Sequence, residues 1–216
     1  MEAFNTIVRF FQQGGLFMYP IVVVLAIGLT IAIERWVYLS MASTRNRMLW
    51  KKLVPILQRG GFQEAAAITS KSKTAIGSIL SYGLARIDSA RRRDDIEKAM
   101  EESLMEVLPR LEKRTHYLAT FANIATLLGL LGTIIGLIKA FTAVAAANPA
   151  EKADLLSASI SVAMNTTAFG LMVAIPLLLI HTLLQTKTTE LVDSLEMVSV
   201  KFLNSVAERR APPQAA

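Results

Sequence analysis

The stretch SASISVAMNTTAFGLMVAIP, residues 157–176, contains three serines, an asparagine and two adjacent threonines, yet no charged side chain. It lies inside an apolar block, 155–180, of about 26 residues, and about 20 helical residues cross a hydrocarbon core of ~30 Å. Two more blocks, 117–138 and 17–33, are about 22 and 17 residues long. With 53% hydrophobic residues, the chain is too apolar for an ordinary soluble domain. The sequence predicts an all-α membrane protein with three transmembrane helices.

The distribution of charge predicts how these helices are oriented. Most of the 23 Lys and Arg residues lie between the first and second blocks, and few lie in the short loop between the second and third. The positive-inside rule then places the N-terminus and the short loop outside. We therefore expect an outer segment 1–16, a first span 17–39, an inner helical segment 40–116, a second span 117–142, an outer loop 143–154, a third span 155–184 and an inner helix and tail 185–216.

Helical stripes continue from the second and third blocks into the inner parts of the chain. One consists of Ile96, Met100, Leu104, Val107, Leu111 and Leu118, and the other of Leu191, Leu195, Val198, Phe202 and Val206. We expect the first to run unbroken into the second block, bending at Pro109, and the inner segment to break earlier at Gly60-Gly61. Projecting amphipathic helices need a covering face, which self-association would supply. A homo-oligomer is therefore expected.

Small residues form a face on each of the last two membrane helices. On the second helix they are Ala122, Thr126, Gly129, Thr133, Gly136 and Ala140, and on the third they are Ala163, Thr167, Gly170 and Ala174. Such faces allow helices to approach closely in lipid. Plain helix packing explains the glycines and alanines, and a threonine hydroxyl can also bond to its own helix. Because each face carries a hydroxyl near its middle, Thr133 and Thr167 are also candidates for an ion pathway.

The third helix has a second polar side. At 100° per residue Asn165 points roughly opposite Thr167, so that one polar side can line a channel and the other can bond to a neighbouring helix. Ser159 and Thr166 are further candidates for polar lining or interhelix contacts. Lys139 lies near the outer end of the second helix, where it can snorkel. A side-chain proton relay requires an ionisable group at depth, and the three blocks provide none. If ions cross here, the carboxylate must come from another polypeptide.

The segments GLLGTIIGLIKAF (129–141) and TTAFGLMVAIP (166–176), with FMYPI and ERWVYL in the first span, resemble the MotA/TolQ/ExbB proton-channel family, in particular its three-helix ExbB/TolQ branch. The resemblance implies an ion-driven motor subunit of the bacterial inner membrane, with a periplasmic N-terminus and a cytoplasmic C-terminus. It also implies a homopentamer around an ExbD- or TolR-like single-span partner, whose membrane aspartate faces Thr133 and Thr167. A TonB-like or TolA-like protein would receive the motion. No cofactor, metal or nucleic acid is expected.

One position departs from this pattern. ExbB- and TolQ-like proteins commonly carry a glutamate five residues before the third-helix threonine, and this chain has Val162 there. Either this chain dispenses with a second carboxylate, as MotA-like proteins do, or its ion path differs. The polar residues Ser159, Asn165 and Thr166 keep sodium open as the coupling ion. A non-conducting oligomeric scaffold remains the alternative from another class. An intramembrane enzyme is disfavoured, because both histidines lie at the ends of the blocks. A MotA-type stator is disfavoured because 40–116 contains no fourth apolar block.

Overall fold

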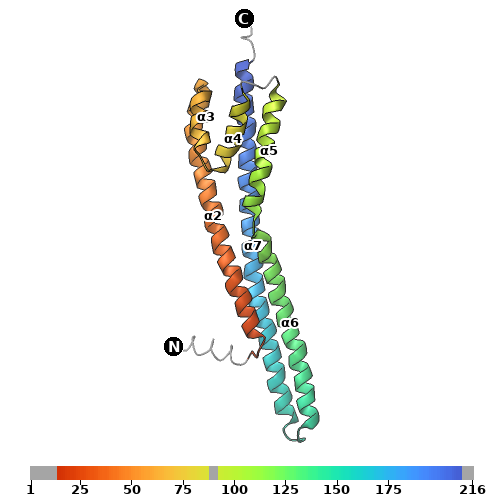
Figure 1. Ribbon diagram of the computed structural model, residues 1–216. Helices are drawn as coiled ribbons and strands as arrows, with labels where there is room; N and C mark the ends of the chain where they lie inside the picture. The colour runs from red at the N-terminus through yellow and green to blue at the C-terminus, as the bar shows by residue number, and fades with distance from the viewer. Residues whose placement is uncertain (1–13, 88–91, 211–216) are drawn as a thin grey trace, which may run out of the picture. The chain divides into compact units, whose positions relative to one another are not determined.

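The structure is a computed structural model that describes residues 14–87 and 92–210 (Figure 1). Over these ranges it is helical and contains no strand. The helices are α2 (Met18–Arg59), α3 (Phe62–Ser70), α4 (Ala75–Arg86), α5 (Arg93–Glu112), α6 (Thr115–Ala146) and α7 (Lys152–Arg210). They form two compact units, and the long helices α2 and α7 contribute to both. The predicted all-α fold is confirmed.

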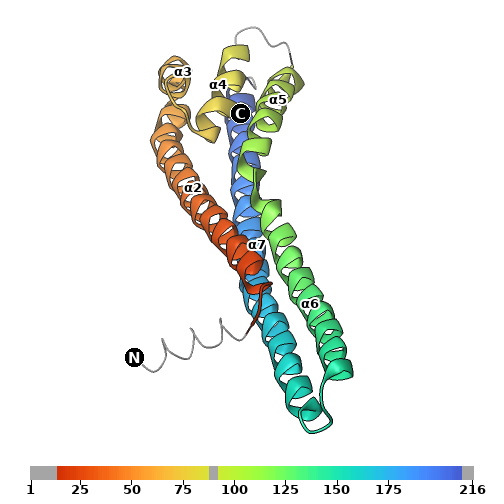
Figure 2. The same ribbon diagram turned by 60° about the horizontal axis from the view of Figure 1, so that its bottom comes forward.

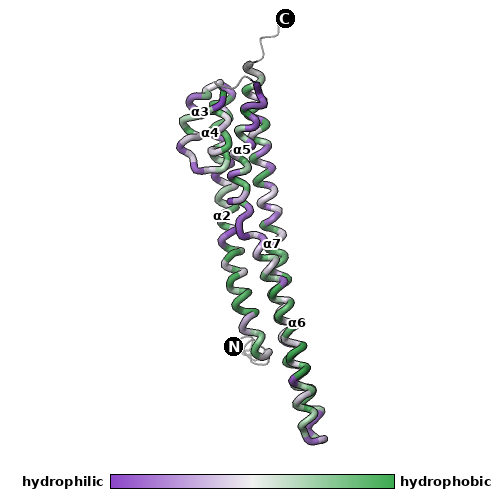
Figure 3. Tube along the Cα trace, turned by 45° about the vertical axis from the view of Figure 1, so that its right-hand side comes forward, coloured by the Kyte–Doolittle hydropathy of each residue, from purple (hydrophilic) through white to green (hydrophobic). Residues whose placement is uncertain are grey.

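Unit 1 comprises residues 14–34 and 114–183 of the described chain. It holds the start of α2, the whole of α6 and the first part of α7. Within the described residues, three helical stretches are long and apolar enough to cross a membrane, as the sequence predicts. α6 and α7 lie side by side as a hairpin in both ribbon views (Figures 1 and 2), and they are predominantly hydrophobic in this unit (Figure 3).

Unit 2 comprises residues 35–113, apart from 88–91, and 184–210. Here the end of α2 packs with α3, α4, α5 and the end of α7 around an apolar core. Its largest fully buried side chains include Phe202, Leu53 and Met100. A Cβ on Gly83 would lie 2.7 Å from the Met100 sulfur and 3.0 Å from Phe202 Cε1, so α4 packs against this core without a side chain at that position.

Two residues with positive φ mark the helix boundaries. Gly60, at φ 78°, follows the end of α2, where a left-handed residue commonly terminates a helix. The predicted break at Gly60-Gly61 is therefore confirmed. Pro109 lies inside α5 without ending it. The expectation of an unbroken helix into the second block is wrong, because the chain leaves helical geometry at Lys113 and Arg114, the latter at φ 65°.

The predicted apolar stripes face the interior of a single chain. Of the first stripe, Leu104 alone is only partly buried, and the tail stripe from Leu191 to Val206 is buried throughout. The stripe residues are covered by other helices of the same chain, so self-association is not needed to shield them. That step of the sequence argument is wrong. The apolar surface left uncovered belongs mainly to the membrane blocks. In the most apolar stretch of the second candidate span, only 22% is buried inside the structure.

Candidate functional site

The small faces of α6 and α7 bring the two backbones into close contact. A Cβ on Gly129 would lie 3.2 Å from Thr167 Cα, and a Cβ on Gly170 would lie 2.7 Å from the Ala125 carbonyl oxygen. Gly136 opposes Ala163 in the same way, at 2.9 Å from the Ala163 Cβ. The structure therefore joins these four predicted packing residues in one interface. Ala174, the fifth, is buried farther along α7.

Thr167 links the two helices through its side chain. Its Oγ1 donates a hydrogen bond of 2.8 Å to the carbonyl oxygen of Gly129 on α6. The bond forms because Gly129 has no side chain that would hold the helices apart. The Gly129 oxygen also lies in the i→i−4 ladder of α6, so it accepts from outside its own helix as well. Thr167 is half-buried, and this hydroxyl lies next to the tightest contact of the hairpin.

Thr133 has a different partner. Its Oγ1 donates to the carbonyl oxygen of Leu130, three residues earlier on its own helix, at 2.6 Å. Thr133 and Thr167 therefore lie on the paired helices without sharing a hydrogen bond. Both hydroxyls donate to protein carbonyls, which leaves each hydroxyl oxygen as an acceptor.

The remaining predicted polar residues occupy distinct environments. Thr166 is 2% exposed, and its hydroxyl lies 2.5 Å from the Gly14 oxygen and 3.0 Å from the Val162 oxygen. It contacts the segment before α2, whereas the sequence predicted polar lining or a contact between helices. Asn165 and Ser159 are half-buried, and Lys139 is exposed near the far end of α6.

Sequence reasoning missed two features of this site. A Cβ on Gly132 would collide with Thr166 Cγ2, so Gly132 is a packing residue that the predicted face omitted. The segment Gly14-Gly15 packs on α7, where a Cβ on Gly15 would lie 3.2 Å from Val162 Cγ1. The signal was present, because adjacent glycines immediately before an apolar block favour close backbone approach.

Charge in unit 1 is confined to the ends of the apolar blocks. Among the described residues of this unit, the acidic side chains are Glu34, Glu151 and Asp154, and each lies outside the three blocks. Glu34 accepts a hydrogen bond of 3.1 Å from Arg114, and these side chains are 44% and 48% exposed. Over 14–87 and 92–210, no group of three or more His, Cys, Asp or Glu is arranged to hold a metal ion.

Comparison with known proteins agrees with this architecture. A biopolymer transport protein ExbB homolog of Methanothermobacter thermautotrophicus is 28% identical over 197 residues, covering 90% of this chain and 68% of that protein. The biopolymer transport protein exbB1 of Vibrio cholerae is 27% identical over 170 residues, covering 76% and 73%. The Tol-Pal system protein TolQ of Haemophilus influenzae is 35% identical over 79 residues, covering 37% and 34%.

The family comparison covers more than half of the chain. Residues 71–197 match the MotA/TolQ/ExbB proton channel family, and this range includes α6 and the part of α7 that packs on it. The three apolar helices are those expected of a multi-pass inner-membrane protein. The chain therefore belongs to the MotA/TolQ/ExbB proton channel family, whose members are channel and transport subunits.

Proposed function

We propose that this protein is the ion-driven motor subunit of an ExbB–ExbD or TolQ–TolR type complex. In this proposal a homopentamer surrounds a single-span, ExbD- or TolR-like partner that carries a membrane aspartate. The N-terminus is periplasmic, and segments 40–116 and 185–216 are cytoplasmic. The complex energises an envelope process such as TonB-dependent outer-membrane transport, and a TonB-like or TolA-like protein receives the work.

One observation carries this proposal: the hairpin of α6 and α7 presents the Thr167 hydroxyl beside its closest contact and the Thr133 hydroxyl on α6, but no carboxylate within the blocks. A group that titrates in the membrane is expensive unless other polar groups solvate it. Thr133 and Thr167 can accept a hydrogen bond from a protonated carboxyl group, or donate to its anion by exchanging their present carbonyl partners. The chain thus offers solvation for an acid that it does not contain.

The free energy of one ion crossing the membrane is sufficient to move the partner helix from one hydroxyl contact to the next. Burial in a low-dielectric site disfavours the ionised carboxylate, so protonation makes the partner helix easier to move past an apolar wall. Each charge that crosses 100 mV releases about 2.3 kcal/mol. This free energy exceeds the ~0.6–2 kcal/mol of one interhelical hydrogen bond in a membrane. One ion can therefore exchange one hydroxyl contact for another.

Val162 is consistent with a single titrating acid per partner helix. It packs on Gly15, so apolar contact fills the position where related proteins commonly carry a glutamate. Sodium coupling, or a Tol-type or gliding motor, would use the same architecture with a different ion or output.

A second candidate function is a non-conducting membrane scaffold. The observation that favours it is that both threonine hydroxyls are already bonded to carbonyls of this chain. In that case the hydroxyls serve packing alone, and removing either one has little effect on function.

Reconstitution with the partner separates these candidates. The chain is co-expressed with a single-span, ExbD- or TolR-like protein that carries a membrane aspartate, and ion uptake into proteoliposomes is followed with a pH-sensitive dye in sodium-free and sodium-containing buffers. Thr167→Val should assemble with the partner but lose uptake, while Thr167→Ser, which keeps the hydroxyl, should retain it. Normal uptake by Thr167→Val would contradict a role of Thr167 in the ion pathway, and no uptake by the wild-type complex would favour the non-conducting scaffold. Uptake by the chain without any partner would contradict a carboxylate supplied by the partner.

A further inference from the structure

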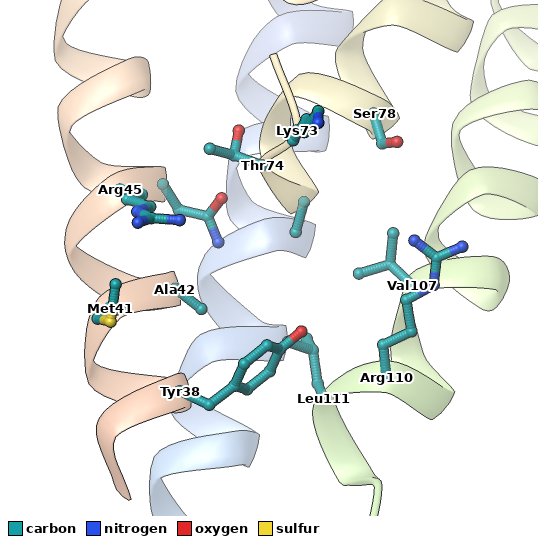
Figure 4. A pocket seen from close by; sticks show the side chains of 12 residues that line it. Tyr38, Met41, Ala42, Arg45, Lys73, Thr74, Ser78, Val107, Arg110 and Leu111 are labelled. Atoms are coloured by element: carbon teal, nitrogen blue, oxygen red, sulfur yellow. The ribbon is translucent and has the colours of Figure 1, made fainter. Parts of the chain in front are cut away.

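A cavity of about 350 Å³ lies inside unit 2, far along the chain from the threonine hydroxyls (Figure 4). Three separate parts of the chain form its walls: α2, the turn before α4 together with the first turns of α4, and α5. The lining residues are Tyr38, Met41, Ala42, Arg45, Asn46, Lys73, Thr74, Ala75, Ser78, Val107, Arg110 and Leu111. We propose that this cavity binds a phosphate group, carried either by an anionic lipid or by a small soluble molecule.

The charge of the lining is the first support for an anionic ligand. Arg45, Lys73 and Arg110 come from the three different walls, and the lining includes no acidic residue. All three residues are exposed, and an anion at the opening of the cavity would be attracted by each of them. Guanidinium groups also match phosphate oxygens, because they donate two parallel hydrogen bonds.

A buried donor without a partner is the second, independent support. Asn46 is 2% exposed and lines the cavity. Its Oδ1 accepts the backbone N–H of Ile76 at 3.2 Å, which fixes the orientation of the amide and leaves Nδ2 as the other end. Nδ2 has no hydrogen-bond partner. A buried unsatisfied donor costs about 1–3 kcal/mol, so an acceptor at this place is favoured.

The N-terminus of α4 adds a third contribution of the same sign. α4 is 12 residues long, and Thr74 caps it by accepting the Gly77 N–H at 3.1 Å. Two of the first N–H groups of α4 already donate to Thr74 and Asn46. The helix therefore attracts an anion mainly through the positive end of its dipole. The hydrogen bonds to a ligand would come from side chains, including the hydroxyl of Ser78 and the amide of Asn46.

The position of the cavity along α2 explains why both sources of phosphate are considered. Tyr38 follows Ile33, the last residue of the first apolar block, by five residues, which is about 7.5 Å of helix rise. Arg45 lies about 18 Å beyond Ile33 by the same measure. Measured along α2 alone, Tyr38 is within reach of lipid headgroups, and Arg45 is beyond them. The proposal is independent of the ion-motor function.

The test compares two double variants of the full-length protein with equal loss of charge. Lys73→Gln/Arg110→Gln removes two cations of the cavity, and Lys52→Gln/Lys98→Gln removes two exposed cations that do not line it. Inorganic phosphate is titrated by calorimetry at constant ionic strength, with chloride as the reference anion. In parallel, each protein is placed in phosphatidylcholine nanodiscs with and without phosphatidylglycerol, and the retained lipid is measured by native mass spectrometry.

The wild type and the control variant should bind the phosphate group. The cavity variant should lose at least tenfold in affinity, which is on the order of one charge-assisted hydrogen bond. A response to inorganic phosphate assigns a soluble ligand, and retention of phosphatidylglycerol without that response assigns a lipid. Asn46→Asp keeps the acceptor for the Ile76 N–H but replaces the unpartnered donor, and it should also abolish binding. Equal losses in the two double variants, or no binding in either arm, would overturn the proposal.

Discussion

Replacing Gly170 by alanine should separate α6 from α7. The new Cβ would lie 2.7 Å from the Ala125 carbonyl oxygen and 3.1 Å from Gly129 Cα. Both obstacles are backbone atoms, so no rotamer change can relieve the clash. The helices must move apart by about 0.7 Å to restore ordinary contact, and a gap of ~0.5–1 Å forfeits a quarter to a half of each dispersion contact. The Thr167 hydrogen bond to Gly129, adjacent to this contact, would lengthen as well.

The magnitude follows from two opposing terms. Overpacking costs about 1–3 kcal/mol, while Gly→Ala in a helix interior recovers about 0.5–1 kcal/mol. Gly28→Ala is the matched control, because its Cβ meets only the flexible side-chain end of Leu177, at 2.8 Å. We therefore expect Gly170→Ala to be less stable than Gly28→Ala by about 1–3 kcal/mol.

The assay is equilibrium unfolding of the purified protein in mixed micelles, with helicity followed by circular dichroism as the mole fraction of SDS rises. The transition of Gly170→Ala should shift to lower SDS, and that of Gly28→Ala should stay near the wild type. If the two variants unfold together, the backbones do not approach as closely as the structure indicates, and the explanation of the Thr167 bond fails with it.

Three further predictions concern single side chains. Thr167→Val should lower the free energy of unfolding by about 0.6–2 kcal/mol in the same assay, whereas Thr133→Val, which removes only a bond within one helix, should change it less; equal losses would contradict this assignment. Arg114 has φ 65°, so Arg114→Val should be less stable than Arg114→Gly by at least about 1 kcal/mol, and the reverse order of melting temperatures would exclude the left-handed geometry. Thr74→Ala should cost about 0.5–2 kcal/mol by removing the cap of α4, and Thr74→Ser should restore most of it in thermal melts, since a serine hydroxyl can also accept the Gly77 N–H.

The fold was largely predictable because the strongest signals are physical requirements of the bilayer. Apolar blocks of sufficient length predicted the three spans, and Gly60 supplied the left-handed residue that ends α2. The break at Lys113 and Arg114 could not be predicted, because both residues are good helix formers and a positive φ at an arginine has no signal in the sequence. The covering of the tail stripe was misjudged because periodicity shows that a face is apolar but does not show which helix covers it.

The candidate site was predicted in outline. On α6, Ala122, Gly129, Gly136 and Ala140 of the predicted small face are buried or lie against α7, whereas Thr126 and Thr133 are not buried. The sequence argument selected Thr126 and Thr133 for the small face, while the structure buries Ala125 and Gly132 instead. Both sets fit a spacing of three and four around the shared Gly129, so the pattern cannot choose between them. The rotation of α6 depends on its contact with α7, and it also decides which carbonyl each threonine hydroxyl reaches. Whether either threonine lies on an ion pathway stays a prediction.

The ion pair between Glu34 and Arg114 has a consequence for membranes of different thickness. Both side chains are nearly half exposed, so each remains hydrated and neither can be drawn into hydrocarbon at low cost. The pair should therefore stay at the membrane–water interface and fix the depth of α2 and α6 in one leaflet. A thinner or thicker bilayer must then be accommodated at the opposite leaflet, where alanine-rich turns can enter or leave the interface cheaply. Acyl-chain length should accordingly alter the short loop between α6 and α7 first.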